Sequence, residues 1–140
     1  MASESRPSEG IRAVIAVGVL AVGLIHTLDL QSKFHETPYL GVAYVALIVA
    51  SVVAAGGVLM GSDQRWMSAA ALVALTPMVG YVLSRSIGLP DANGDIGNWL
   101  EPLGVASLFV ESAVLVLVGE LRVNGKRMGR DSAALRGSFV

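Results

Sequence analysis

The side chains most able to do chemistry gather in one stretch, IHTLDLQSKFHE, at residues 25 to 36. It holds both histidines of the 140-residue chain, His26 and His35, together with Asp29 and Glu36. Imidazole nitrogens and carboxylate oxygens bind zinc, copper or iron, and the later Glu101 offers one more such ligand. The set His26, Asp29, His35, Glu36 and Glu101 is therefore a candidate transition-metal site. No HExxH or ExxH spacing is present, so a histidine that only bonds to Asp29 is the main alternative, and haem held by the two histidines is another.

A second group of polar residues centres on Glu111, the one formal charge inside the apolar blocks 13–25, 40–60, 66–83 and 102–119. Ser107 precedes Glu111 by four residues, so the two share one face of a helix. An ionisable side chain near the middle of a bilayer normally faces the protein interior and has a partner. We expect an intramembrane polar group able to carry protons, made of His26, Tyr81, Ser107 and Glu111. The alternatives are a glutamate that only joins two helices, or one that contacts a partner subunit.

Arg85 ends the third apolar block and is the expected cation of an outer-face ion pair. Asp29, Glu36 or Glu101 is its expected acid, and the alternative is that its guanidinium reaches lipid phosphates. The motif DANGDIG follows at residues 91–97. It resembles the start of a calcium loop but lacks the required glycine at the sixth position, so we expect a plain acidic turn there.

The elements that position these side chains follow from composition. The chain is 54% hydrophobic and only 15% charged, whereas about a quarter of the residues of a soluble domain are charged. Each of the four apolar blocks, with its neutral flanks, approaches the ~20 residues that cross the hydrocarbon core as a helix. A helix satisfies its own backbone hydrogen bonds in lipid. The sequence therefore predicts an all-α membrane protein with four transmembrane helices in an up-down bundle.

The expected organisation has three parts: a cytoplasmic segment 1–10, a transmembrane domain 11–121, and a basic cytoplasmic tail 122–140. The helices are expected at about 11–31, 38–60, 64–87 and 99–121. Thr37 and Pro38 predict the start of the second helix, Ser62 is an expected cap for the third, and Asn98 with Glu101 forms a capping box for the fourth.

The basic residues predict the orientation of the bundle. Lys33 and Arg85 alone lie beside the first and third loops, and the other eight of the ten basic residues lie before the first block, between the second and third, or after the fourth. Because cytoplasmic loops carry the excess of Lys and Arg, both termini are expected in the cytoplasm. The region around His26 and Glu101 then faces outward.

An internal similarity suggests tandem duplication of a helical hairpin. ETPYLGVA (36–43) and EPLGVA (101–106) each place a glutamate, a proline and Leu-Gly-Val-Ala at the outer start of an inward-running helix. Chance is the alternative, because these residue types dominate the chain. Gly41 and Gly104 would in either case let helices approach closely.

The sequence disfavours an enzyme without excluding one. The chain has no cysteine, so it has no disulfide and no thiolate ligand or nucleophile. It contains no nucleophile elbow, phosphate loop or dinucleotide fingerprint. The expected partners are the lipid bilayer and other membrane subunits or further copies of the chain, and no nucleic acid.

The segments YVLSRSIGLP and GNWLEPLGVASLFVE resemble those of uncharacterised small four-helix integral-membrane proteins of high-GC bacteria, across roughly residues 20–115. The resemblance implies a multi-pass protein of a bacterial inner membrane and brings no reaction with it. Three functions stay open. The first is an accessory or interaction subunit whose outward His/Asp/Glu cluster binds a partner or a metal. The second is a proton-coupled transporter or proton relay using Glu111 and His26. The third is a metal or haem redox protein.

Overall fold

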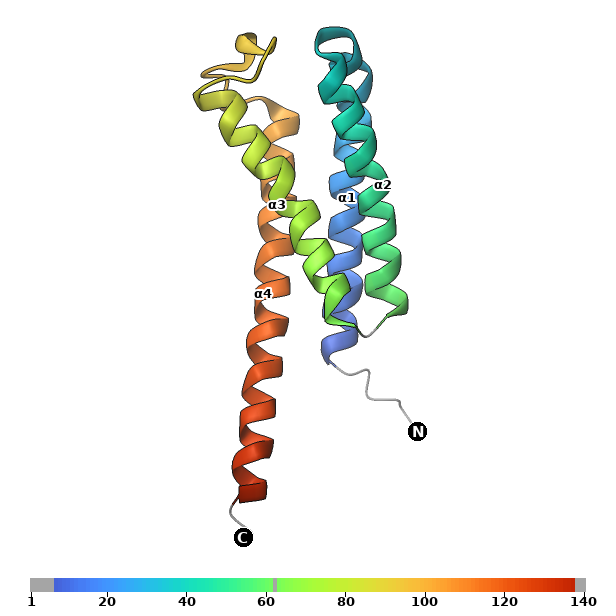
Figure 1. Ribbon diagram of the computed structural model, residues 1–140, viewed down its shortest axis with the longest axis vertical. Helices are drawn as coiled ribbons and strands as arrows, with labels where there is room; N and C mark the ends of the chain where they lie inside the picture. The colour runs from blue at the N-terminus through green and yellow to red at the C-terminus, as the bar shows by residue number, and fades with distance from the viewer. Residues whose placement is uncertain (1–6, 62, 138–140) are drawn as a thin grey trace.

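The computed structural model describes residues 7–61 and 63–137, which form four long helices (Figure 1). These are α1 (Pro7–Glu36), α2 (Pro38–Met60), α3 (Gln64–Ser86) and α4 (Pro102–Gly137), with the single-turn η1 (Asn93–Asp95) between the last two. The described residues contain no strand. Each long helix is long and apolar enough to cross a membrane. The prediction of an all-helical chain with four such helices is confirmed.

The helix boundaries agree with the sequence best in the middle of the chain. α2 matches its predicted range, and α3 ends one residue earlier than expected. α1 continues past residue 31 to Glu36, whose carboxylate accepts hydrogen bonds from Ser32 and Lys33 one turn earlier. α4 continues to Gly137, so residues 122–137, expected as a tail beyond the last span, extend the same helix. Ala, Leu, Arg, Lys and Met dominate that stretch, and all of them favour helix.

Two of the predicted helix caps differ from the structure. α4 begins at Pro102, not near residue 99, and Glu101 caps it in place of Asn98. The Glu101 carboxylate accepts hydrogen bonds from the backbone N–H groups of Leu103 (3.0 Å) and Gly104 (2.6 Å), so the acid occupies the cap position itself. Pro38 opens α2 as predicted, but the Thr37 side chain makes no capping bond.

The N-cap of α3 is Asp63. The predicted cap, Ser62, lies outside the described residues. Asp63 accepts a hydrogen bond from the backbone N–H of Arg65 at 2.9 Å. This bond and the Arg65 side chain hold the pKa of Asp63 below its usual value.

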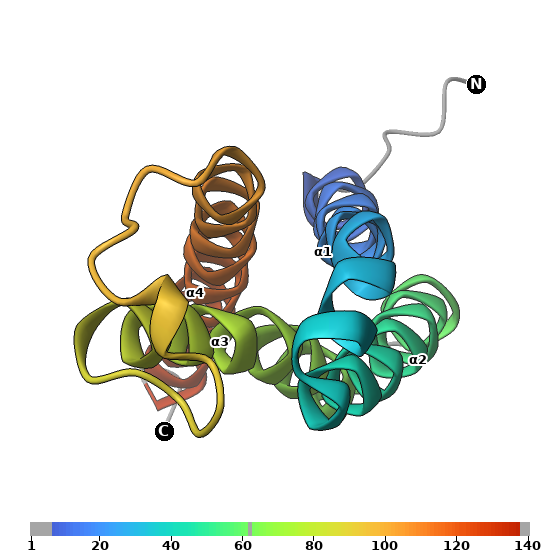
Figure 2. The ribbon, with the colours of Figure 1, turned by 90° about the horizontal axis from the view of Figure 1, so that it is seen from above.

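Consecutive helices run in opposite directions and form two hairpins, α1–α2 and α3–α4, which diverge toward the end that carries η1 (Figures 1 and 2). The apolar core occupies the half of the bundle where α1 begins. It is formed by small and branched side chains from all four helices: Ile15, Ala16, Val19, Val22, Ala54, Ala55, Val58, Met67, Ala70, Val73, Ala74, Val114 and Val118. Small residues let the helix backbones approach closely.

Candidate functional site: a polar cavity between the hairpins

The half of the bundle opposite the apolar core encloses a cavity of about 450 Å³ between the two hairpins. This volume is in the range of small-molecule sites. All four helices and the loop between α3 and α4 contribute to its wall. Its polar and charged lining consists of His26, Asp29, Ser32, Lys33, Glu36, Tyr44, Thr76, Tyr81, Ser84, Arg85, Asp95, Glu101, Ser107 and Glu111.

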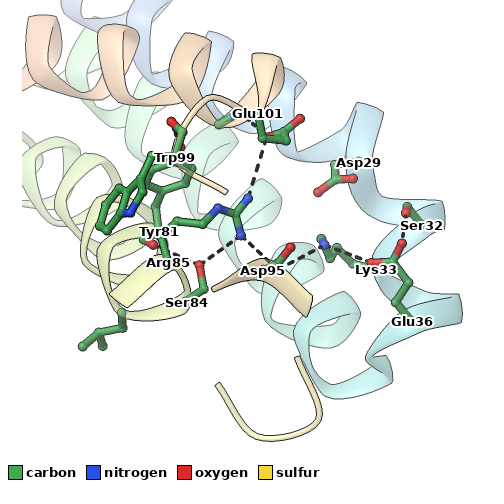
Figure 3. A network of polar contacts seen from close by, with 12 residues as sticks. Asp29, Ser32, Lys33, Glu36, Tyr81, Ser84, Arg85, Asp95, Trp99 and Glu101 are labelled. Carbon is green, nitrogen blue, oxygen red and sulfur yellow. Dashed lines mark hydrogen bonds and ion pairs between the residues drawn. The ribbon is translucent and has the colours of Figure 1, made fainter. Parts of the chain in front are cut away.

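Arg85 is the centre of the charged contacts at the mouth of this cavity (Figure 3). Its side chain is only 8% exposed, and its guanidinium lies 3.0 Å from Asp95 and 3.9 Å from Glu101. The same group lies 4.8 Å from the centre of the Tyr81 ring and donates a hydrogen bond to the Ser84 hydroxyl at 3.3 Å. Two carboxylates and an aromatic face therefore replace much of the water around this buried cation.

Asp95 joins the two hairpins across the mouth. One of its carboxylate oxygens lies 3.0 Å from Arg85 on α3 and 3.7 Å from Lys33 on α1. Lys33 also contacts Glu36 at 3.0 Å, so a chain of alternating charges runs from α1 to α3 (Figure 3). The η1 turn that carries Asp95 is thus bound to both sides of the opening.

Backbone carbonyls hold the loop between α3 and α4 in place. The Tyr39 hydroxyl on α2 donates to the Pro90 carbonyl at 2.6 Å, and the Tyr81 hydroxyl on α3 donates to the Trp99 carbonyl at 2.7 Å. The backbone N–H of Gly97 donates to the Arg85 carbonyl at 2.9 Å. The ion pairs of Arg85 and Asp95 are therefore supported by the loop's own backbone contacts.

His26 lies deeper on the α1 wall and is buried. Its Nδ1 is 2.9 Å from the carbonyl oxygen of Val22; because a carbonyl only accepts, Nδ1 carries the proton and a neutral ring keeps Nε2 free as an acceptor. The Tyr44 ring packs edge-on against His26, with ring centres 4.7 Å apart. The Tyr44 hydroxyl donates a long bond of 3.5 Å to Asp29. A histidine, a tyrosine and an aspartate are thus adjacent on this wall.

Glu111 is among the most buried side chains of the described chain, at 1% exposure. One carboxylate oxygen accepts a hydrogen bond from Ser107, one turn earlier on α4. The other oxygen, Oε2, is buried and has no hydrogen-bond partner among the described residues, and the same holds for Nε of Arg85. A buried polar atom without a hydrogen-bond partner raises the free energy of the folded state. A proton or a cation bound at Oε2 would therefore stabilise the Glu111 side chain.

The structure separates the five residues of the candidate metal site. Four of them, His26, Asp29, Glu36 and Glu101, line the cavity, but His35 is exposed and does not. In residues 7–61 and 63–137, no group of three His, Asp or Glu side chains is placed to hold a metal ion. The two histidines also lie in different surroundings, one buried and one exposed. The metal and haem hypotheses gain no support from this arrangement.

The four residues expected to carry protons line the same cavity, but at two depths. Ser107 and Glu111 lie on α4 and His26 on α1, while Tyr81 belongs to the mouth, against Arg85 and Trp99. Among the acids expected to pair with Arg85, Glu101 lies within 4 Å of it.

Several polar lining residues belonged to none of the sites predicted from the sequence, among them Lys33 and Tyr44. The one usable signal was the position of Tyr44, whose hydroxyl lies within a mostly apolar span.

Comparison of the chain with protein-family models gives no match, and searches of curated proteins and of solved structures give none either.

Proposed function

We propose that the chain is a four-span integral protein of a bacterial cell membrane, with both ends in the cytoplasm and the cavity open to the outside. Large apolar side chains exposed along the helices, such as Val17, Leu24, Val52, Phe109 and Val116, support a lipid-facing flank. Among the residues that the structure describes, seven of the nine basic ones belong to segments at the end opposite the cavity mouth. The positive-inside rule then favours a cytoplasmic location for that end.

Within this orientation, the chain acts as a proton-coupled transporter or proton relay. The observation that carries the proposal is that one cavity contains both the charged mouth and Glu111. A carboxyl group with one unpaired buried oxygen suits a site that is loaded and unloaded with a proton. His26 lines the same cavity with a free ring nitrogen, and imidazole passes protons readily near neutral pH.

Proton flux into proteoliposomes tests this function. A pH-sensitive dye inside the vesicles should report collapse of an imposed pH gradient by the wild-type chain, with charge balanced by a potassium ionophore. Glu111→Gln should abolish the flux, because an amide cannot take up the proton. Glu120→Gln is the matched control, since it makes the same change at an exposed position of the same helix. A wild-type gradient that persists as in empty vesicles, or full flux in Glu111→Gln, contradicts the proposal.

An accessory-subunit role is the second candidate, and one feature of the loop between α3 and α4 favours it. Four apolar side chains are exposed there: Ile87, Ile96, Trp99 and Leu100, with Leu100 at 85%. Exposed apolar side chains near a membrane surface suit contact with another membrane subunit or with the lipid interface. Without proton flux, this role is the better supported of the two.

The duplication of a helical hairpin is supported by one matched contact. Gly41 near the start of α2 lies against the ring of Phe34 on α1, and Gly104 near the start of α4 lies against the ring of Tyr81 on α3. At both places a side chain larger than hydrogen would collide with the ring. The two hairpins thus share a glycine–aromatic contact at the position where their sequences agree.

A further inference from the structure

The charges around the cavity do not balance. Among the residues described, its lining carries five acidic side chains and two basic ones: Asp29, Glu36, Asp95, Glu101 and Glu111 against Lys33 and Arg85. Both bases are already engaged, Lys33 by Glu36 and Asp95, and Arg85 by Asp95 and Glu101.

Asp29 and Glu111 are the two lining acids with no cation within 4 Å among the described residues. Within the described chain, Asp29 accepts only the long bond from Tyr44, and Glu111 only the bond from Ser107. Figure 3 shows Asp29 on α1 facing the Arg85 group without an ion pair to it. The Oε2 atom of Glu111 is buried without a partner, so the site presents an acceptor that nothing in the described chain fills.

The rest of the wall is apolar and aromatic. Ile25, Leu40, Leu47, Pro77 and Leu103 line the cavity beside the acids, together with the Tyr44 ring. An organic ammonium ion needs both kinds of surface, a carboxylate and aromatic face for its charge and an apolar wall for its carbon body. A bare inorganic cation would make no favourable contact with the apolar wall. An anion would be repelled by the excess of carboxylates.

We propose that the cavity binds a small organic ammonium ion, whose charged nitrogen pairs with Glu111 and whose carbon body packs against Tyr44 and the apolar wall. Asp29, closer to the mouth, is the first unpaired carboxylate that the cation meets. This inference rests on the proposed function, because both use the same cavity and Glu111. It adds the class of substrate that the site would take.

Calorimetric titration of the full chain in lipid nanodiscs tests it, with three probes of matched shape: benzylammonium, benzyl alcohol and benzoate. Empty nanodiscs correct for partition into lipid. Benzylammonium should bind saturably, and the neutral and anionic analogues should bind roughly tenfold more weakly or not at all. This comparison uses the wild-type chain alone, so it does not depend on a variant that folds.

Variants then locate the charge. Glu111→Gln should weaken benzylammonium binding by roughly tenfold or more, and Asp29→Asn should weaken it measurably. Glu120→Gln and Asp63→Asn, at exposed positions outside the cavity, should leave it unchanged. Equal binding of all three probes, or unaltered binding in Glu111→Gln, overturns the inference.

The two proposals fail separately. Proton flux that requires Glu111, with no benzylammonium bound, removes the ligand class and leaves the proton function standing. Benzylammonium binding that requires Glu111, with no proton flux, removes the proton function and leaves a cation-binding site.

Discussion

Arg85 shows how a single residue can organise a site. Its guanidinium contacts Asp95 and Glu101 and lies over Tyr81, while its own carbonyl accepts a bond from the loop that carries Asp95. It therefore positions the loop through both its side chain and its backbone. Removing the side chain would leave two partly buried carboxylates without their nearest cation.

Arg85→Ala should lower the free energy of unfolding by about 1–3 kcal/mol, the usual cost of losing hydrogen bonds to a charged group. Chemical unfolding in mild detergent would measure it. Arg65→Ala is the matched control, because the Arg65 side chain is 85% exposed and its ion pair with Asp63 lies at the surface. Exposed pairs contribute little, so equal effects of the two substitutions would contradict the role assigned to Arg85.

Residue spacing predicted contacts within one helix, whereas between elements the sequence anticipated the pairing of Arg85 with Glu101 but few other contacts. The bond between Ser107 and Glu111 follows from a four-residue spacing on one helix. Asp95 was expected in an acidic turn, but its contact with Lys33 was not predicted, because that contact depends on where the loop between α3 and α4 folds. No local pattern in DANGDIG carries that information.

At the scale of elements, the sequence predicted four helices and the limits of α2 because hydrophobic blocks and Pro38 mark them directly. The sequence underestimated the length of α4. The charged residues in 122–137 indicate the end of a membrane span but not the end of a helix. Hydropathy reports whether a residue prefers water or lipid, whereas the continuation of a helix depends on the helix propensity of its residues.

Close contact between elements concentrates at Gly57 on α2, where an added Cβ atom would overlap the indole ring of Trp66 on α3. Gly57→Ala should lower the free energy of unfolding by roughly 1–3 kcal/mol, as overpacking does. Gly56→Ala is the control, since its added Cβ would meet no atom within 4 Å beyond the adjacent backbone of its own helix, and it should be neutral or stabilising. Thermal unfolding of both variants in detergent measures the difference. Equal melting temperatures for Gly57→Ala and Gly56→Ala would contradict this packing.

At the scale of the whole molecule, the bundle is packed at one end and hollow at the other. The sequence did indicate polar residues near one end of the bundle, since His26, Asp29, Arg85 and Glu101 all lie near the ends of apolar blocks. It did not predict the size of the cavity that they line. That depends on how far the two hairpins diverge, which no hydrophobic pattern specifies.

The proposed orientation can be tested by labelling, because the chain has no cysteine of its own. Gly94→Cys in η1 and Gly125→Cys in the α4 extension both replace exposed glycines with open space around them. A membrane-impermeant maleimide added to intact cells should label the first and reach the second only after lysis. The reverse pattern would mean that the cavity faces the cytoplasm.

The unequal packing of the two halves also has an electrical consequence. A hollow lined with charges and open to water has a higher dielectric constant than a dry apolar core. The membrane potential would then fall mainly across the half that contains Ile15, Val58 and Val114. A unit charge crossing the whole potential gains or loses about 2.3 kcal/mol per ~100 mV. A cation that travels from the outside to Glu111 would experience little of that energy, and the remaining step to the cytoplasm would carry most of the voltage dependence.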